Sequence, residues 1–287
     1  MIGIGPIPAQ KWTSDNEKSA MKIVRFYDAK LGVRHGFVEN EAICVAEGGL
    51  FSGLRPTAER IPLEGVRLLA PLDPVNILAI GRNYKAHAEE WGGSLPKAPI
   101  LFIKATTALV GPEDDVVLPA LAPNAVDFEA ELAVVIKRTA RHVTEADALD
   151  YVLGYTCAND VSARDCQRGD EQWCRGKSFD TFCPLGPWIE TEFDPADSPI
   201  QGRVNGETLQ NANTGLLVFN VPFLIRYLSA GMTLLPGTVI LTGTPGGVGS
   251  ARTPPRFLKA GDEMEVEVSG IGTLRNRAVT ATKASLS

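Results

Sequence analysis

Two glutamates, Glu129 and Glu131, stand two residues apart in the segment VDFEAELAVVI. In a β-strand alternate side chains share a face, so the segment predicts both carboxylates on one face together with Ala133 and Val135. Neighbouring carboxylates resist joint ionisation unless water screens them or a cation lies between them, and hard divalent ions prefer oxygen ligands. A solvated strand face gives the same pattern, so the pair alone does not define a metal site.

A third carboxylate, Asp160, follows an apolar run in GYTCANDVSARD. An acid at the end of a strand is suited to complete a metal site, although Asp160 could equally cap the next turn. Mg²⁺ and Mn²⁺ commonly use a few carboxylates and leave positions for water or substrate. Glu129, Glu131 and Asp160 are therefore the candidate ligands for Mg²⁺ or Mn²⁺, with the choice of ion left open.

A candidate general base lies in NYKAHAEE, which has helical spacing and is stopped by two glycines. His87 and Glu90 are three residues apart and so share a helix face, where the carboxylate can orient the imidazole and raise its basicity. Glu89 is turned away from His87 by its spacing of two. A surface pair without a catalytic role gives the same pattern.

Lys177 and Thr244 are candidate contacts to a substrate. Lys177 lies in WCRGKSFDTFCPLGPW, where partial burial would hold the ammonium rigid beside a developing negative charge; an ordinary surface lysine is the alternative. Thr244 lies in LTGTPGGVG, where glycines allow a close approach of the backbone and the hydroxyl could hydrogen-bond a small carboxylate. The segment has neither the ending of a phosphate-binding loop nor a dinucleotide fingerprint, so no nucleotide cofactor is indicated.

Composition narrows the classes of partner. The chain has 287 residues and a net charge of -6, with no dense cluster of Lys and Arg, which argues against binding to nucleic acid. No apolar run approaches the ~20 residues that span a bilayer, so a cytoplasmic protein without a membrane partner is predicted. The five cysteines lack a C-x-x-C pair and are interpreted as reduced thiols.

The elements that must position these residues are mostly strands. Residues 1–20 show no periodicity and form a predicted N-terminal extension, and residues 21–70 contain short alternating strands typical of a small β domain. A larger domain over residues 71–287 combines further strands with a helix at RNYKAHAEEW and another at VPFLIRYLSAG. Strands and helices do not alternate regularly, so a mostly β, α+β fold is predicted rather than a doubly wound sheet.

An ordered set of segments resembles the catalytic domain of the fumarylacetoacetate hydrolase family over roughly residues 71 to 280. In order, these are GRNYKAHAEE, ILFIKATTALVGP, VDFEAELAVVI, GYTCANDVSARD, RGKSFDTFCPLGPW, VNGETLQNANT, LTGTPGGVG and LKAGDEMEVEVSGIGTLRN. The resemblance implies a mixed β-sandwich roll, a homodimer and a magnesium or manganese ion. It also implies roles for individual residues: metal ligands Glu129, Glu131 and Asp160; a lid pair His87 and Glu90; an active-site Lys177; and pocket residues Tyr84, Arg164, Gln167 and Thr244.

The predicted activity is cleavage of a C–C bond in an acylpyruvate or related 2,4-dioxo acid. In this mechanism the metal chelates the carboxylate and 2-oxo group, His87 activates water, and Lys177 neutralises developing charge. Related chemistry without water attack would make the protein a 2-hydroxyhepta-2,4-diene-1,7-dioate isomerase and decarboxylase or an oxaloacetate decarboxylase. A non-catalytic protein that binds small acids on the same fold is the alternative from another class.

Overall fold

The structure, a computed structural model, describes residues 21–281, so the predicted extension at residues 1–20 lies outside the described residues. Strands dominate the described part of the chain, and the helices are few and mostly short. The prediction of a mostly β, α+β fold is therefore confirmed. Among residues 21–281 no helix has both the length and the apolar character needed to cross a membrane.

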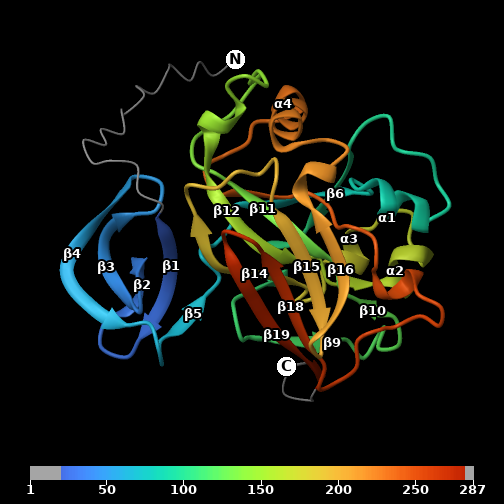
Figure 1. Cartoon of the computed structure of the whole chain (residues 1–287), viewed down its shortest axis with the longest axis horizontal. Helices are drawn as coiled ribbons and strands as arrows, with labels where there is room; N and C mark the ends of the chain where they lie inside the picture. Colours follow the sequence, from blue (N-terminus) through green and yellow to red (C-terminus); the bar gives the residue numbers. More distant parts are fainter. Residues whose placement is uncertain (1–20, 282–287) are drawn as a thin grey trace.

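The N-terminal strands form an antiparallel meander, seen in blue in Figure 1. Its core contains Val24 and Phe26 of β1 with Ile43 and Val45 of β3. The strands are β1 (Lys22–Asp28), β2 (Gly32–Glu39), β3 (Ala42–Gly49), β4 (Gly53–Pro62) and β5 (Arg67–Leu69). Because β1 also pairs with β14 of the larger part, one sheet runs through both parts of the molecule. The division into domains at residue 70 remains a proposal.

The larger part is built on a sheet whose inner strands are buried on both faces. The strand order from β1 onward is β14, β12, β11, β17, β6 and β7. All seven residues of β11 are buried, which explains its nearly continuous apolar sequence. The bounds are β6 (Asn76–Gly81), β7 (Ile100–Lys104), β11 (Ala130–Ile136), β12 (Val152–Asn159), β14 (Cys183–Glu190) and β17 (Thr238–Leu241).

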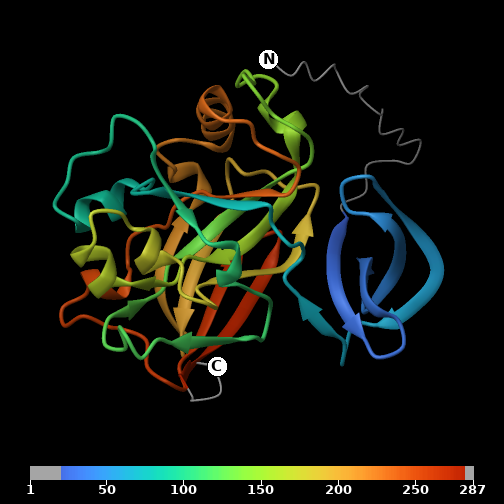
Figure 2. The ribbon, with the colours of Figure 1, turned by 180° about the vertical axis from the view of Figure 1, so that it is seen from behind.

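A second, five-stranded sheet packs across the first and gives the sandwich visible in Figures 1 and 2. Leu132 and Val134 of β11 share an apolar cluster with Val266 of this sheet and with Leu224 and Leu228 of α4. The sheet contains β16 (Glu207–Asn213), β15 (Pro199–Val204), β18 (Glu263–Val268), β19 (Gly272–Thr280) and β9 (Asp115–Leu118). Helix α4 covers Val221–Gly231, with Pro222 in its first turn.

Short elements line the part of the fold that carries the candidate chemistry. They include the helices α1 (Lys85–Glu90), α2 (Arg164–Gly169) and α3 (Cys174–Lys177), and the short strands β8 (Leu109–Val110), β10 (Val126–Asp127) and β13 (Ser162–Ala163). Single 3₁₀ turns cover Thr106–Ala108, Ala148–Tyr151, Thr214–Leu216 and Gly249–Ala251. Helix α1 ends before Gly92, whose φ of 65° lies in the left-handed region that glycine favours.

One strand differs from the sequence-based expectation. VDFEAELAVVI was expected to form one long strand, but the chain breaks between β10 and β11, and β10 pairs with β13 instead of extending the large sheet. At the break the Asp127 carboxylate accepts hydrogen bonds from the backbone N–H groups of Gly249 and Ser250. These contacts turn the chain, so Glu129 precedes β11 rather than lying within it.

Candidate active site

The three predicted metal ligands come together because two strands pair. Ala130 of β11 lies opposite Asn159 of β12, and the Asp160 N–H donates to the Glu129 carbonyl oxygen at 2.9 Å. Glu129, Glu131 and Asp160 are all buried, and one carboxylate oxygen from each lies within 4.8 Å of the others. The structure thus places in one cluster three acids that are separated in the sequence by as many as 31 positions.

Two lysines neutralise part of this cluster. The Lys177 ammonium donates to Glu129 at 2.7 Å and to Asp160 at 2.6 Å. The Lys104 ammonium donates to the other Asp160 oxygen at 2.6 Å and also to the backbone carbonyl of Lys177. Burial disfavours a charged lysine, but the charges of Asp160 and Glu129 raise the pKa of Lys177, so its side chain remains a cation.

Arg164, at the start of α2, is buried behind Glu129. Its guanidinium donates to Asp127 at 2.8 Å, to Glu129 at 2.7 Å and to the Gln167 side chain at 2.8 Å. Burial alone would raise the pKa of Glu129, but the charges of Lys177 and Arg164 outweigh burial and lower it. Glu129 is therefore ionised at neutral pH.

Among the residues that the structure describes, no lysine or arginine forms an ion pair with Glu131. Its carboxylate accepts a hydrogen bond from the Gly243 N–H at 2.6 Å, but burial and the charges of Asp160 and Glu129 raise its pKa well above the ordinary value. Such a group becomes favourable as an anion when a further cation lies against it.

The donor set suits a hard divalent ion. At the site, with Glu131 ionised, the buried acids exceed the buried bases by one charge, the acids being Asp127, Glu129, Glu131 and Asp160 and the bases Lys104, Arg164 and Lys177. The oxygens of Glu129 and Asp160 already accept from lysine or arginine, but each carboxylate oxygen has more than one lone pair and can also bind a metal. The three carboxylates therefore form a cluster that could hold a divalent ion.

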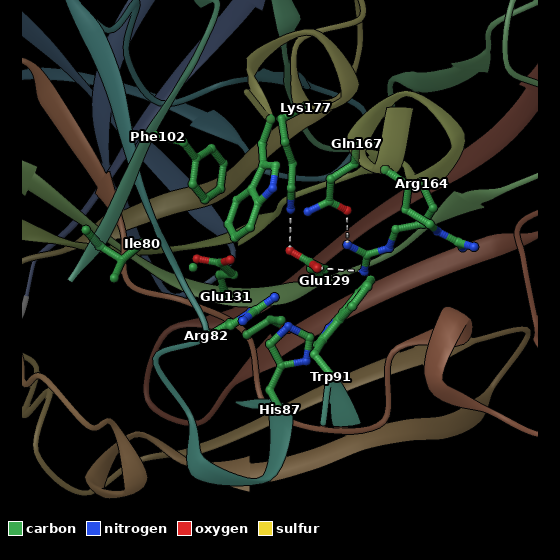
Figure 3. A pocket seen from close by; sticks show the side chains of 14 residues that line it. Ile80, Arg82, His87, Trp91, Phe102, Glu129, Glu131, Arg164, Gln167 and Lys177 are labelled. Carbon is green, nitrogen blue, oxygen red and sulfur yellow. Dashed lines mark hydrogen bonds and ion pairs between the residues drawn. The ribbon is translucent and has the colours of Figure 1, made fainter. Parts of the chain in front are cut away.

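His87 and Glu90 of α1 form the predicted pair. The His87 Nδ1 atom lies 2.9 Å from Glu90, whose other carboxylate oxygen accepts from the Gly247 N–H at 2.5 Å. In the tautomer in which Nδ1 donates its proton to Glu90, Nε2 keeps a lone pair. No hydrogen bond to Nε2 is made by residues 21–281. Figure 3 shows the ring directed toward Glu129, so a free base faces the acidic cluster.

A cavity of about 190 Å³ joins the two groups. His87, Glu129, Glu131 and Lys177 all contribute to its wall, together with the aromatic side chains of Trp91, Phe102 and Trp173. Helix α1 forms one side of the cavity. The hydrogen bond from the Gly247 N–H to Glu90 connects this helix to the glycine-rich segment after β17. A substrate in this cavity would touch the base and the acidic cluster at once (Figure 3).

The four predicted pocket residues have different surroundings. Arg164, Gln167 and Thr244 line the cavity, whereas Tyr84 is buried outside its wall and its hydroxyl lacks a hydrogen-bond partner among the described residues. Burial, and then the charge of Glu131, raise the pKa of Tyr84. The Thr244 hydroxyl donates to the Ala130 carbonyl at 3.0 Å, which uses its only proton. Substrate contacts by these four residues remain predictions.

Sequence reasoning missed several residues that hold the site together. Lys104 ends an ordinary apolar strand, and Asp127 falls in the segment in which only Glu129 and Glu131 were singled out. Gln210 lies in β16 of the second sheet, within the segment VNGETLQNANT, in which no individual residue was singled out. A charged or amide side chain within an apolar run is the one feature that could have identified Lys104 and Asp127, because such groups are buried only when they have partners.

Gln210 gives a test of the structural support under the site. Its fully buried amide accepts from the Ala130 N–H at 2.9 Å and donates to Thr244 at 2.7 Å and to the Pro245 carbonyl at 2.8 Å. Gln210→Leu should lower the free energy of unfolding by about 2–4 kcal/mol, because these groups lose their partners in a dry environment. Urea denaturation measures the change. Gln201→Leu, on neighbouring β15, is the control, and equal losses in both variants would contradict the assigned role.

The chain belongs to the fumarylacetoacetate hydrolase family. The family model described as fumarylacetoacetate (FAA) hydrolase C-terminal matches residues 76–279, and one described as Rv2993c-like, N-terminal, matches residues 21–71. The resemblance noted in the sequence is thereby confirmed. Together with the cavity that is lined by His87 and by two of the three clustered acids, membership identifies the protein as an enzyme of this family.

Named relatives have several activities. The mitochondrial oxaloacetate tautomerase FAHD2A of Homo sapiens is 47% identical over 225 residues, covering 76% of this chain and 71% of the human protein. The crystal structure of 2-hydroxyhepta-2,4-diene-1,7-dioate isomerase from Mycobacterium marinum has a TM-score of 0.83 and 41% identity, covering 92% of this chain and all of that one. A fumarylacetoacetate hydrolase from psychrophilic Exiguobacterium antarcticum has a TM-score of 0.83 and 38% identity, covering 91% of this chain and 100% of that one.

Proposed function

We propose that this enzyme catalyses proton transfer next to the carbonyl of a small 2-oxo acid, interconverting keto and enol forms or double-bond isomers. The observation that carries this proposal is the unpaired Nε2 of His87, which shares one cavity with Glu129 and Glu131 of the acidic cluster, while Nδ1 of the same ring contacts Glu90. Relatives named as a tautomerase and an isomerase support it. Isomerisation was among the alternatives in the sequence-based prediction, where hydrolysis came first, whereas tautomerisation was not.

In the proposed mechanism Glu129, Glu131 and Asp160 hold Mg²⁺ or Mn²⁺. When bound, the ion supplies a Lewis acid that polarises the 2-oxo group and acidifies the neighbouring C–H bond. His87 takes a proton from carbon 3 through Nε2 and gives it to the oxygen on carbon 2, which forms the enol, and the opposite direction retraces these steps. For a double-bond isomer the proton goes instead to another carbon of the conjugated chain. Glu90 keeps the other ring nitrogen protonated and stabilises the imidazolium that forms.

Lys177 stabilises the negative oxygen of the enolised substrate. Its ammonium remains charged because Asp160 and Glu129 raise its pKa, and it lies in the cavity wall. A fixed cation in a site closed to water stabilises developing charge without reorganising at the moment of reaction. Helix α1, fastened through Glu90 to Gly247, supplies that closure on one side.

Hydrolysis of an acylpyruvate is the second candidate function. The same Nε2 atom could take a proton from water, whose oxygen would then attack the distal carbonyl and release pyruvate and a carboxylic acid. The similarity to the Exiguobacterium antarcticum hydrolase favours this alternative. The two reactions share the base and the metal, so they are separated by their products.

Two assays run with Mg²⁺ decide between these functions. We expect the enzyme to accelerate the loss of enol-oxaloacetate absorbance in proportion to its concentration, with little release of pyruvate from acetylpyruvate. Pyruvate release without tautomerisation would overturn the proposal in favour of hydrolysis. Failure of both reactions in protein whose melting temperature responds to the metal would identify a non-catalytic protein that binds small acids.

We also propose a homodimer, as the family resemblance implies. Exposed apolar side chains such as Ile103, Leu121 and Leu216 give the described surface area that a second copy could cover. Sedimentation analysis should give twice the mass of the chain. A monomer at micromolar concentration would contradict this assembly.

A further inference from the structure

Two arginines in the cavity wall have no acidic partner. Arg82 follows β6 and Arg168 lies in α2, and both line the cavity. Arg164 and Lys177, the other arginine and lysine in this wall, are each bound to buried carboxylates. Neither the Arg82 nor the Arg168 side chain forms an ion pair or hydrogen bond with any residue in 21–281. Guanidinium groups are strong ligands for carboxylates, so two unpaired ones mark a place for an anion.

The charge balance of the site also favours an anion beside Arg82 and Arg168. With Glu131 ionised, the buried acids of the site exceed its buried bases by one charge, which a divalent ion would turn into an excess of one positive charge. One substrate carboxylate compensates for that excess. Arg82 and Arg168 then remain as two further positive charges facing the cavity. A substrate with a second carboxylate complements this field better than a monocarboxylate does.

The backbone places Arg82 in an unusual way. Its φ of 54° lies in the left-handed region, which is disfavoured for a residue with a Cβ atom and is concentrated at functional sites. Gly81 before it packs so closely on the Trp173 ring that a Cβ atom would overlap the ring. Figure 3 shows the Arg82 side chain between Glu131 and His87, directed into the cavity.

An apolar wall lies beside these charges. Phe102 and Trp173 meet edge to face with ring centroids 5.5 Å apart, and both line the cavity. Aromatic faces suit the carbon atoms of a short chain, whereas charged groups suit its ends. A molecule with a 2-oxo carboxylate at the acidic cluster and a second carboxylate a few atoms away would meet both kinds of surface.

We propose that Arg82, assisted by Arg168, binds the second carboxylate of the substrate and makes the enzyme selective for 2-oxo dicarboxylates. This inference rests on the proposed function, because it assumes that the 2-oxo end of the substrate binds at Glu129, Glu131 and Asp160. Arg82 makes the larger contribution, since Arg168 is exposed and its charge is screened by water and salt.

Binding of two matched acids tests the inference. Oxaloacetate and 2-oxobutyrate have the same number of carbon atoms and differ only in a carboxylate that replaces a methyl group. Calorimetric titration with Mg²⁺ should show oxaloacetate binding about 10-fold or more tightly than 2-oxobutyrate. Arg82→Gln should weaken oxaloacetate binding about 10-fold and 2-oxobutyrate binding less than about twofold. Arg168→Gln should weaken oxaloacetate binding by about threefold.

Two further variants separate recognition from structural damage. Arg55→Gln removes the same charge from an exposed residue of β4 and should change neither affinity. Arg82→Lys keeps the charge without the paired donors and should recover part of the selectivity. Equal weakening of both acids in Arg82→Gln would assign Arg82 a structural role and overturn the inference.

The outcomes also distinguish this inference from the proposed function. An enzyme that tautomerises oxaloacetate but binds both acids equally well keeps the proposed function and loses the second carboxylate site. Protein that neither binds nor converts oxaloacetate when Mg²⁺ is present contradicts the proposed function, and the inference fails with it.

Discussion

Replacing His87 by alanine is expected to lower turnover of the 2-oxo acid by about 10²- to 10⁴-fold, the usual contribution of a positioned general base. The Nε2 atom is the free base of the cavity, and its loss leaves the metal ligands in place. The thermal response to Mg²⁺ should therefore remain close to that of the unmodified enzyme. Steady-state rates and melting curves measure the two effects separately.

Two glutamates of α1 supply a matched comparison for this base. Glu90→Gln removes the charge that orients His87 and should lower turnover by about 10²-fold. Glu89→Gln changes an exposed side chain that lies 3.8 Å from Lys85, and should leave turnover within about twofold. Full activity in His87→Ala, or equal losses in the two glutamine variants, would rule out the assigned pair.

Two other substitutions, Glu131→Gln and Glu129→Gln, are expected to change the stability of the metal-free protein in opposite directions. The Glu131 charge is buried beside Asp160 and Glu129 without a cation of its own, so its removal should raise the melting temperature. Glu129 is bound to Lys177 and Arg164, and removing its charge leaves two buried cations undercompensated. That change should lower the free energy of unfolding by about 3 kcal/mol or more.

Stabilisation by Mg²⁺ should distinguish the Glu131→Gln and Glu129→Gln variants from the unmodified enzyme. A ligand that binds only the folded state stabilises it by about 2.7 kcal/mol at 100 times its dissociation constant. Glu131→Gln and Glu129→Gln should each lose most of that gain with Mg²⁺, since each lacks a ligand. An unchanged metal response in both would show that the ion binds elsewhere.

The raised pKa of Glu131 gives a pH dependence with a definite sign. An acid whose pKa in the folded state lies above its ordinary value of 4.5 favours folding at low pH. This contribution to stability is lost as the pH rises from the ordinary pKa of Glu131 through its raised pKa in the folded state. Without metal, Glu131→Gln should therefore gain stability over the unmodified protein as pH increases. Melting curves at several pH values with EDTA test this, and a pH-independent difference would contradict it.

Local patterns were enough to predict much of the site. The spacing of two in VDFEAELAVVI predicted that Glu129 and Glu131 lie together, which they do although the strand begins only after Glu129. Helical spacing pairs His87 with Glu90, whose side chains lie 2.9 Å apart. Each of these contacts joins residues close in sequence, so spacing is sufficient. From spacing alone, Asp160 could either cap a turn or join the two glutamates. The pairing of β11 with β12 places Asp160 beside Glu129 and Glu131.

The contacts that could not be predicted join distant parts of the chain. Lys104 reaches Asp160 across 56 positions, and Gln210 reaches Ala130 across 80. Such pairs depend on the order of strands in two sheets, which no short segment encodes. The break before β11 has the same origin, because Asp127 accepts hydrogen bonds from Gly249 and Ser250. In this segment the local β propensity predicts one continuous strand, but the tertiary contacts of Asp127 interrupt it.

The proposed proton transfer is tested most directly by exchange of hydrogen at carbon 3 of the substrate. Oxaloacetate in deuterated buffer with Mg²⁺ is followed by proton NMR, with and without enzyme. We expect the enzyme to accelerate loss of the carbon 3 signal well beyond the spontaneous rate, and His87→Ala to abolish most of that acceleration. Exchange at the spontaneous rate in the presence of metal-loaded enzyme would contradict the proposal, as would equal acceleration by His87→Ala.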